Sequence, residues 1–273
     1  MELALNGATT MKADLVTDIR VATLAGFDYI EIWSAKLRAY LESQTTAELG
    51  TLLESSNVKP YSINSIERIT FRDDRAHDEL LSECGQLCAI ASEIGCPYVV
   101  VVPSPLPEGV GRPETVRESA RVLGELGRIA QRHGVGLAFE FLGQADCSVQ
   151  TLELASEIVR QVDRANVGLV IDSFHFYTGG SSFESIEALD PARLFIFHIN
   201  DAEDLPRHQL EDRHRLLPGA GILPLNEIIH ALRRAGYDRV ASVEIFRPEY
   251  WERDPLELAR DARAAAASII GME

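Results

Sequence analysis

Short runs of apolar residues alternate along the chain with longer segments in which apolar positions recur every three or four residues. Short runs rich in β-branched and aromatic side chains are typical of buried strands, whereas the wider spacing is typical of helices with one buried face. The pattern predicts eight strands, at residues 2–6, 29–33, 59–65, 98–102, 136–141, 167–171, 194–199 and 240–245. It predicts helices at residues 13–25, 46–55, 74–94, 113–133, 148–162, 183–188, 225–235 and 255–270.

This order of elements points to one class of fold. Apolar strands that each precede a helix indicate a parallel sheet covered by helices. An open, doubly wound sheet is the alternative, but no Gly-x-Gly-x-x-Gly motif follows the first strand, and eight strand–helix units suit a closed barrel. No linker rich in proline, glycine or serine divides the chain. The sequence therefore predicts a single α/β domain, a (β/α)₈ TIM barrel, over residues 1–273.

The net charge of the chain argues against one class of partner, nucleic acid. The formal net charge is −16, from 42 acidic and 26 basic residues. A protein that binds nucleic acid takes much of its affinity from lysine and arginine, so this balance argues against such a partner. The chain shows no secretory signal pattern and no apolar stretch near the roughly 20 residues of a membrane span. We expect a cytoplasmic protein with a small-molecule substrate and no membrane partner.

Four consecutive predicted strands carry an ionisable residue inside or just past their last apolar residues. These residues are Glu140, Asp172, His198 and Glu244. In (β/α)₈ barrels the active site lies at the carboxyl ends of the strands, and consecutive strands are neighbours. The four side chains should therefore meet on one side of the barrel mouth. The alternative is that each is an isolated polar residue that caps a strand or binds a loop.

Three carboxylates that lie close together repel one another at neutral pH. No lysine or arginine stands at the matching strand ends, so a divalent cation is the simplest source of the missing positive charge. Three oxygen ligands and one imidazole suit Zn²⁺, Mn²⁺, Mg²⁺ or Co²⁺. The sequence thus predicts one metal ion held by Glu140, Asp172, His198 and Glu244.

Several stretches resemble the xylose-isomerase-like barrel superfamily, and the similarity extends over nearly the whole chain. They are residues 6–10, 29–32, 166–175, 217–221 and 242–250. The resemblance implies the same four metal ligands, with Zn²⁺ or Mn²⁺ as the metal. It also implies an isomerase that moves a carbonyl between adjacent carbons of a keto-inositol or a related sugar through an enediolate. Glu140 and Glu244 would then act as the catalytic acid and base as well as ligands.

Four further residues are candidates for contact with the substrate. His175 follows Asp172 on what the pattern indicates is a loop, and the resemblance favours a hydrogen bond from it to substrate rather than a surface position. Arg247 follows Glu244 and could bind a substrate hydroxyl or pair with a ligand carboxylate. Asn6 and Glu31 end the first two strands, where substrate binding and structural hydrogen bonding are equally open.

Two loop segments and four aromatic residues are further candidates for roles at the barrel mouth, as a lid, an anion site or an apolar wall. The polar segment 203–215 is long enough for a mobile lid, with a solvated loop as the alternative. Residues 218–221, Pro-Gly-Ala-Gly, could hold a phosphate, but no basic residue follows them, which favours a turn. Candidates for an apolar wall against a sugar ring are Trp33, Phe71, Phe246 and Trp251.

The superfamily leaves other activities open. They include ketose epimerase and hydroxypyruvate isomerase, and, in a different class, DNA repair as in endonuclease IV. Ketose epimerases carry an arginine shortly after the metal-binding histidine, where this chain has the acidic stretch 200–204, which argues against that reading. The seven scattered histidines and the negative charge argue against DNA repair. A homo-oligomer is compatible with the sequence.

Overall fold

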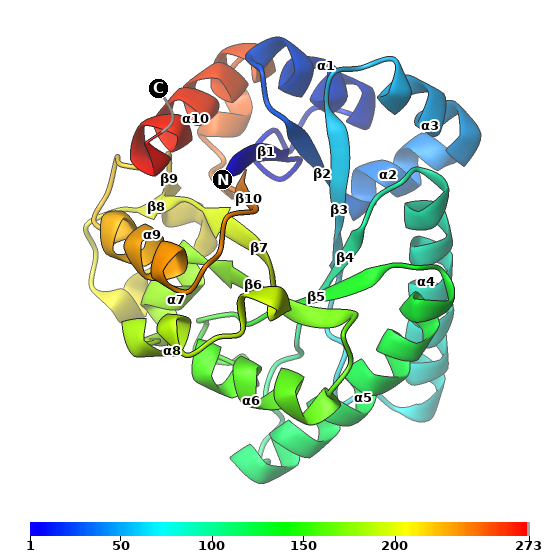
Figure 1. Ribbon diagram of the computed structural model, residues 1–273, viewed down its shortest axis with the longest axis vertical. Coiled ribbons are helices and arrows are strands. Elements are labelled where there is room, and N and C mark those ends of the chain that lie inside the picture. Colours follow the sequence, from blue (N-terminus) through cyan, green and yellow to red (C-terminus); the bar gives the residue numbers. More distant parts are fainter. Residues whose placement is uncertain (272–273) are drawn as a thin grey trace.

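Eight parallel strands form a closed barrel ringed by helices in the computed structural model, which describes residues 1–271 (Figure 1). The strands follow one another around the barrel in chain order, and the first pairs with the last. The TIM-barrel prediction is therefore confirmed. The barrel strands are β1 (Glu2–Asn6), β2 (Tyr29–Trp33), β3 (Lys59–Ile66), β4 (Tyr98–Val101), β5 (Gly136–Glu140), β6 (Val167–Asp172), β7 (Leu194–Ile199) and β10 (Val240–Val243).

All the predicted helices are present, and the structure adds elements that the pattern did not predict. The predicted helices are α1 (Leu15–Ala25), α3 (Thr46–Glu54), α4 (Asp74–Glu93), α5 (Arg112–Arg132), α6 (Leu152–Val162), α8 (Phe183–Glu187), α9 (Leu225–Arg234) and α10 (Pro255–Ile270). The additions are α2 (Ser34–Leu41), α7 (Ser173–Gly179), the short antiparallel pair β8 (Asp201–Ala202) and β9 (Arg215–Leu216), and the 3₁₀ helices η1 (Pro191–Arg193), η2 (Arg207–Gln209), η3 (Asp212–His214) and η4 (Tyr250–Glu252).

Local sequence explains where several of these helices begin and end. Thr45 and Glu48 form a capping box at the start of α3, each side chain accepting a hydrogen bond from the other residue's backbone N–H. Gly26 ends α1 with φ of 83°, a conformation that glycine adopts without steric cost. The carboxylate of Asp172 caps α7 by accepting a hydrogen bond from the backbone N–H of His175. His175 thus lies in the first turn of a helix, and its predicted place in a loop was wrong.

The two faces of each strand meet different surroundings, and this alternation positions the polar residues. Successive side chains on a strand point to opposite faces. Ala138, Val170 and Ile196 belong to one small apolar cluster, whereas the residues that follow them, Phe139, Ile171 and Phe197, belong to the large core shared with the helices. The side chains two residues further along face the same way as this small cluster, toward the barrel axis. They are Glu140, Asp172 and His198, so an apolar layer supports the polar one.

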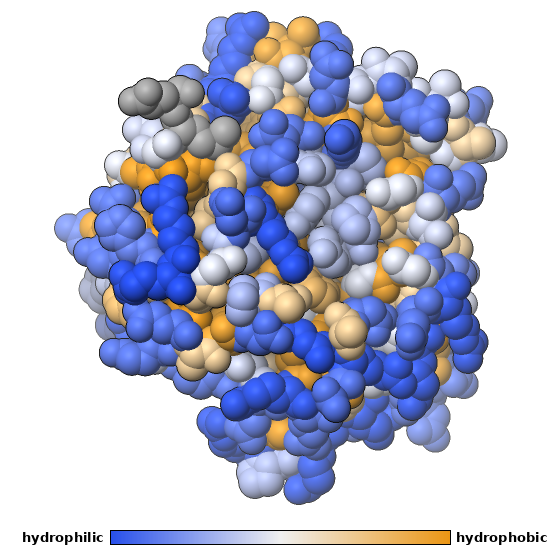
Figure 2. All heavy atoms as spheres, in the orientation of Figure 1, coloured by the Kyte–Doolittle hydropathy of each residue, from blue (hydrophilic) through white to orange (hydrophobic). Residues whose placement is uncertain are grey.

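The face of the molecule seen in Figure 2 is mainly polar. Figure 2 shows hydrophilic residues over most of one face, with hydrophobic residues scattered between them. Among residues 1–271, no helix combines the length and apolar character that a membrane crossing requires.

Candidate metal centre and active site

The four predicted ligands come together in the barrel. Glu140, Asp172, His198 and Glu244 each offer one ligand atom, and these atoms all lie within 4.8 Å of one another. All four residues are buried, none with more than 4% of its surface exposed. Strand register contributes directly, because Asp172 on β6 pairs with His198 on β7. Three carboxylate oxygens and one imidazole nitrogen at this spacing fit a divalent cation.

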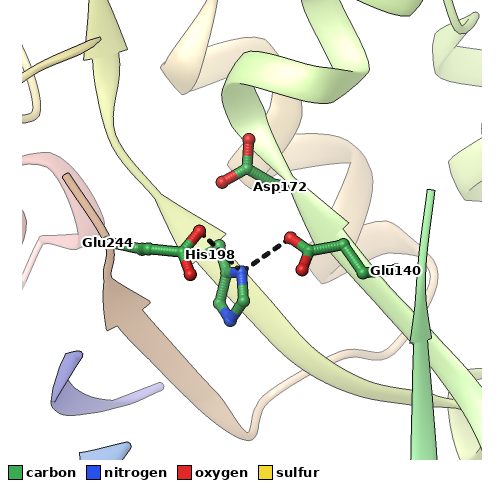
Figure 3. Close-up of side chains that lie close together, drawn as sticks. All are labelled: Glu140, Asp172, His198 and Glu244. Atoms are coloured by element: carbon green, nitrogen blue, oxygen red, sulfur yellow. Dashed lines mark hydrogen bonds and ion pairs between the residues drawn. The ribbon is translucent and has the colours of Figure 1, made fainter. Parts of the chain in front are cut away.

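His198 lies at the centre of the group, with the two glutamates on either side of it (Figure 3). Its Nδ1 is 2.8 Å from Oε1 of Glu140 and 3.3 Å from Oε2 of Glu244. Burial opposes a charge on His198, but the carboxylates of Glu244, Glu31 and Glu140 outweigh burial and raise its pKa well above the usual value. A divalent cation among the carboxylates would take the place of the Nδ1 proton as the source of positive charge.

Glu31 orients the ring of His198 through a hydrogen bond to Nε2, the ring nitrogen that does not face Glu140 and Glu244. The Nε2–H of His198 donates to the Glu31 carboxylate, at 3.0 Å from Oε2, and the Ser242 hydroxyl donates to the same oxygen at 2.7 Å. This hydrogen bond leaves Nδ1 directed toward the other carboxylates. A carboxylate that fixes the second nitrogen of a metal-binding histidine is a common arrangement in metalloproteins. Glu31 is fully buried and lies outside the wall of the cavity described below.

Glu244 is held at both carboxylate oxygens. Asn6 and Asn64 donate side-chain N–H bonds to its Oε1, at 3.0 and 2.8 Å. Nη1 of Arg215 donates to its Oε2 at 3.1 Å. Asn6 is thus fully buried and supports a predicted ligand, and its contact with substrate stays a prediction. Asn64, near the end of β3, has the same role and was not predicted.

Arg215 is a buried cation in the site that was not predicted, because it comes from β9 and not from the end of a barrel strand. Its Nη1 donates to Asp172 at 2.9 Å as well as to Glu244, and its Nη2 donates to Asp212 at 2.9 Å. Only 1% of the side chain is exposed. Burial opposes its charge, but these carboxylates raise its pKa above the usual value. The arginine reaches the site because β9 pairs with β8 and returns the chain to the mouth after the segment 203–214.

The position of Arg215 also removes one argument made from the sequence. The acidic stretch 200–204 lacks the arginine found in ketose epimerases. The chain instead supplies a guanidinium from further along, two residues before the stretch 217–221 that resembles the superfamily. That short distance from a recognised stretch was the signal in the sequence that could have identified Arg215.

The two glutamates on either side of His198 differ in their electrostatic surroundings. Burial, together with the charges of Glu244 and Asp172, raises the pKa of Glu140 to about 8 against the opposing effect of His198. Burial also acts on Glu244, but His198 and Arg215 outweigh it and lower the pKa of Glu244. Two cations, Arg215 and His198, are therefore shared by five carboxylates, those of Glu31, Glu140, Asp172, Asp212 and Glu244. The excess of negative charge favours an added metal ion.

A cavity of about 330 Å³ opens directly over this group. Its floor includes Glu140, Glu244, His175 and Arg215, all of them buried, while exposed residues form its opening. The Trp33 and Phe246 rings, predicted as an apolar wall, line it with their centroids 5.5 Å apart. The other residues at its wall are Asn64, Ser65, Glu67, Arg68, Val102, Pro103, Pro105, Leu142, Gln144, Asp146, Cys147 and Asp212.

The remaining candidate residues fall in different places. His175 lines the cavity, and its Nε2 accepts a hydrogen bond from Nη2 of Arg215 at 3.0 Å. Arg247 instead pairs with Glu203 at 2.7 Å and lies outside the cavity wall. Phe71 also lies outside it, and the Trp251 Nε1–H donates to the Ala8 carbonyl. Contact of His175 and Arg247 with substrate stays a prediction.

The loop that contains residues 218–221 binds a carboxylate of the same chain, that of Asp201. The backbone N–H groups of Gly219, Gly221 and Leu223 donate to the carboxylate of Asp201, at 2.8 to 3.0 Å. Backbone donors of this kind are the groups that would bind a phosphate. Because Asp201 already uses them, the loop acts as a turn beside the mouth, the alternative that the sequence favoured.

The segment 203–214 borders the cavity, to whose wall it contributes Asp212. The Gln144 amide donates to Asp212 at 2.8 Å, which joins the segment to the loop after β5. The Arg207 guanidinium lies 4.7 Å from the centre of the Tyr177 ring, which joins it to α7. Movement of this segment as a lid stays a prediction.

Replacing Glu31 with glutamine is expected to weaken the binding of Zn²⁺ about 10–100-fold, the usual range for losing the carboxylate behind a histidine ligand. The neutral amide of glutamine makes a weaker hydrogen bond to Nε2–H and leaves His198 a poorer ligand. Competition with a chelator of known zinc affinity measures the change. Glu54→Gln, at the exposed end of α3, is the matched control. Equal zinc affinities in the two variants would contradict this role for Glu31.

Known proteins resemble this chain in sequence and in structure. Residues 19–269 match a family model described as xylose isomerase-like TIM barrel. The chain is 38% identical over 272 residues to inosose isomerase from Bacillus velezensis, covering 99% of this chain and 97% of that protein. It is 37% identical over 272 residues to inosose isomerase from Bacillus subtilis, covering 99% and 98%. A crystal structure of the IolI protein with a bound zinc atom superposes with a TM-score of 0.96 at 37% identity, covering 99% of this chain and 98% of that one.

Proposed function

Because this chain belongs to the xylose isomerase-like TIM barrel family, we propose that it is a metal-dependent isomerase of 2-keto-myo-inositol. The observation that carries this proposal is the similarity to inosose isomerases along 99% of the chain. The buried group of three carboxylates and one histidine supports it independently, because its donor atoms fit a metal ion.

The proposed metal is Zn²⁺, with Mn²⁺ as the second choice. The related IolI protein binds zinc with a barrel of the same fold, and a site with one imidazole and three carboxylates accepts either ion. Glu140, Asp172, His198 and Glu244 would hold it. When bound, the ion would supply Lewis-acid stabilisation of negative charge on a substrate oxygen.

The proposed reaction exchanges a carbonyl and a neighbouring hydroxyl on the inositol ring. A proton leaves the carbon that carries the hydroxyl, the electron pair forms an enediolate, and a proton is added to the former carbonyl carbon. One hydroxyl proton moves between the two oxygens, so no oxidant or reductant is consumed. Glu140 and Glu244 lie on opposite sides of His198, which suits one of them to remove the proton and the other to deliver one (Figure 3).

Other residues of the cavity would bind and orient the ring. The rings of Trp33 and Phe246 offer an apolar surface to the C–H groups of a cyclic polyol. Arg215 donates to His175 Nε2, so the neutral imidazole carries its proton on Nδ1, and burial lowers the pKa of His175. His175 would therefore contact substrate as a neutral side chain.

Proton exchange tests the proposal. Zinc-loaded protein is incubated with 2-keto-myo-inositol in D₂O, and the substrate is followed by NMR. The expected result is an isomeric inosose that carries deuterium at the carbon next to the carbonyl. No change in inosose, with exchange into free ketoses or hydroxypyruvate, would overturn the substrate assignment and keep the proton-transfer chemistry.

Ketose epimerisation is the second candidate. The buried guanidinium of Arg215 favours it, because the expected absence of an arginine was the argument against it. The same NMR experiment with a free ketose distinguishes the two activities, since an epimerase exchanges the proton without moving the carbonyl.

A further inference from the structure

The loop that follows β3 has an unusual backbone at the edge of the cavity. Arg68 and Phe71 both adopt left-handed conformations, with φ of 53° and 56°. Residues with a side chain rarely adopt this region, and where they do the surrounding structure must hold them there. Asp163 is also left-handed, at 47°, but it simply ends helix α6, a common position for this conformation. Arg68 has no helix end to explain it.

Hydrogen bonds from Arg72 and Ile69 hold the backbone of this loop in place. Arg72 donates from Nε to the Arg68 carbonyl at 2.6 Å and from Nη2 to the Glu67 carbonyl at 2.7 Å. The backbone N–H of Ile69 donates to the Val102 carbonyl at 3.1 Å, next to the end of β4. The side chain of Arg68 therefore starts from a fixed backbone beside the cavity, although the conformation is unfavourable for arginine.

Arg68 differs from the other arginine of the cavity in what it contacts. Arg215 is buried, and its guanidinium already binds Asp172, Glu244 and Asp212. Arg68 is exposed at the opening, and within residues 1–271 its guanidinium makes no hydrogen bond or ion pair. An uncommitted guanidinium with five N–H donors, carried on a fixed backbone at the wall of a cavity, is suited to bind oxygen atoms of a ligand.

We propose that Arg68 is a specificity-determining residue that binds a hydroxyl oxygen on the edge of the substrate ring remote from the carbonyl. This inference rests on the proposed function for the identity of the ring. The buried carboxylates and His198 would take the carbonyl edge at the floor of the cavity. The opposite edge of a ring in that orientation faces the opening, where Arg68 lies. The unfavourable left-handed backbone at Arg68 would then be retained because it places the guanidinium at the opening of the cavity.

Arg68→Gly separates the two parts of this proposal, because glycine removes the guanidinium and adopts positive φ freely. In zinc-loaded protein, KM for 2-keto-myo-inositol is expected to rise about tenfold, the loss of one charge-assisted hydrogen bond, with kcat within about twofold. The melting temperature is expected to rise by about 2 °C as the backbone strain is released. Asp163→Gly is the matched control, because it relieves the same conformation at an exposed position outside the cavity, and it should raise the melting temperature with KM unchanged.

Two further measurements identify the contact. An inosose that lacks one hydroxyl on the remote edge should show the same KM with wild type and with the Arg68→Gly variant. Calorimetric titration of zinc-loaded protein with myo-inositol tests the contact without turnover, and the variant should bind this cyclic polyol about tenfold more weakly. Equal affinity of wild type and variant for myo-inositol, or a wild type that does not bind it, would overturn the role of Arg68. Failure of the proposed function is seen separately, as absence of inosose isomerisation by wild type.

Discussion

Replacing Glu244 with glutamine is expected to lower kcat for 2-keto-myo-inositol about 10³-fold, within the usual range for losing a group that transfers a proton. Glutamine keeps the size of the side chain, and its oxygen can still accept hydrogen bonds from Asn6 and Asn64. It cannot accept a proton from carbon, and its amide nitrogen would face Nη1 of Arg215, which is also a donor. Steady-state kinetics measure the loss, with the zinc content of each sample determined alongside.

The metal content distinguishes two reasons for inactivity. A variant that retains zinc and has lost turnover supports proton transfer by Glu244, and loss of deuterium incorporation in D₂O should accompany it. A variant that has lost both zinc and turnover supports only a role as ligand. Glu249→Gln, on the exposed loop after β10, is the control and should leave kcat unchanged. Turnover near that of wild type in Glu244→Gln would refute the assignment.

Replacing Arg215 with methionine is expected to lower the free energy of unfolding by about 3–5 kcal/mol, the usual cost of removing one partner of a buried ion pair. Methionine keeps much of the volume but leaves Asp172 and Glu244 without the cation that now contacts both. The loss should be largest in protein stripped of metal by a chelator, because bound zinc compensates part of the missing positive charge. Urea unfolding of zinc-loaded and stripped samples measures both values.

Arg213→Met is the matched control for this experiment. Arg213 lies two residues away in the same segment, but it is exposed and pairs with the exposed Glu211. Such surface pairs contribute little, so the free energy of unfolding should change by no more than about 0.5 kcal/mol. If Arg215→Met and Arg213→Met were equally stable, Arg215 would have no part in balancing the buried carboxylates.

Much of the barrel and the ligand set could be predicted because both depend on strong, repeated patterns. β1, β2 and β7 begin and end where the apolar runs do. Asp172 and His198 could be assigned to one site because each lies at or next to the end of a buried strand, and the ends of neighbouring parallel strands meet. The register of β6 with β7 then places the two side by side. Strand alternation, a purely local property, was enough to direct them into the barrel.

Arg215 could not be predicted in the same way, because its strand gives almost no signal. β8 and β9 have two residues each, too few for any hydrophobic period, and the segment between them is polar. Glu31 was predicted to end the second strand and face the mouth, but it lies in the middle of β2 and outside the cavity wall. Its hydrogen bond to His198 depends on a contact across the barrel that no local pattern records. Helix α7 was not predicted because seven residues are too few to show the helical spacing of apolar positions.

The pairing of β1 with β10 also constrains how the protein is made. Glu2 aligns with Val240, so the barrel closes between the strand that is synthesised before the other seven and the strand that is synthesised after them. Asn6 and Glu244, which bond to each other in the metal centre, are 238 residues apart along the chain. A nascent chain that has not yet extended past β10 lacks both the strand that seals the barrel and the fourth ligand. Tight binding of a metal ion at this site is therefore expected only after β10 has been synthesised and has closed the barrel.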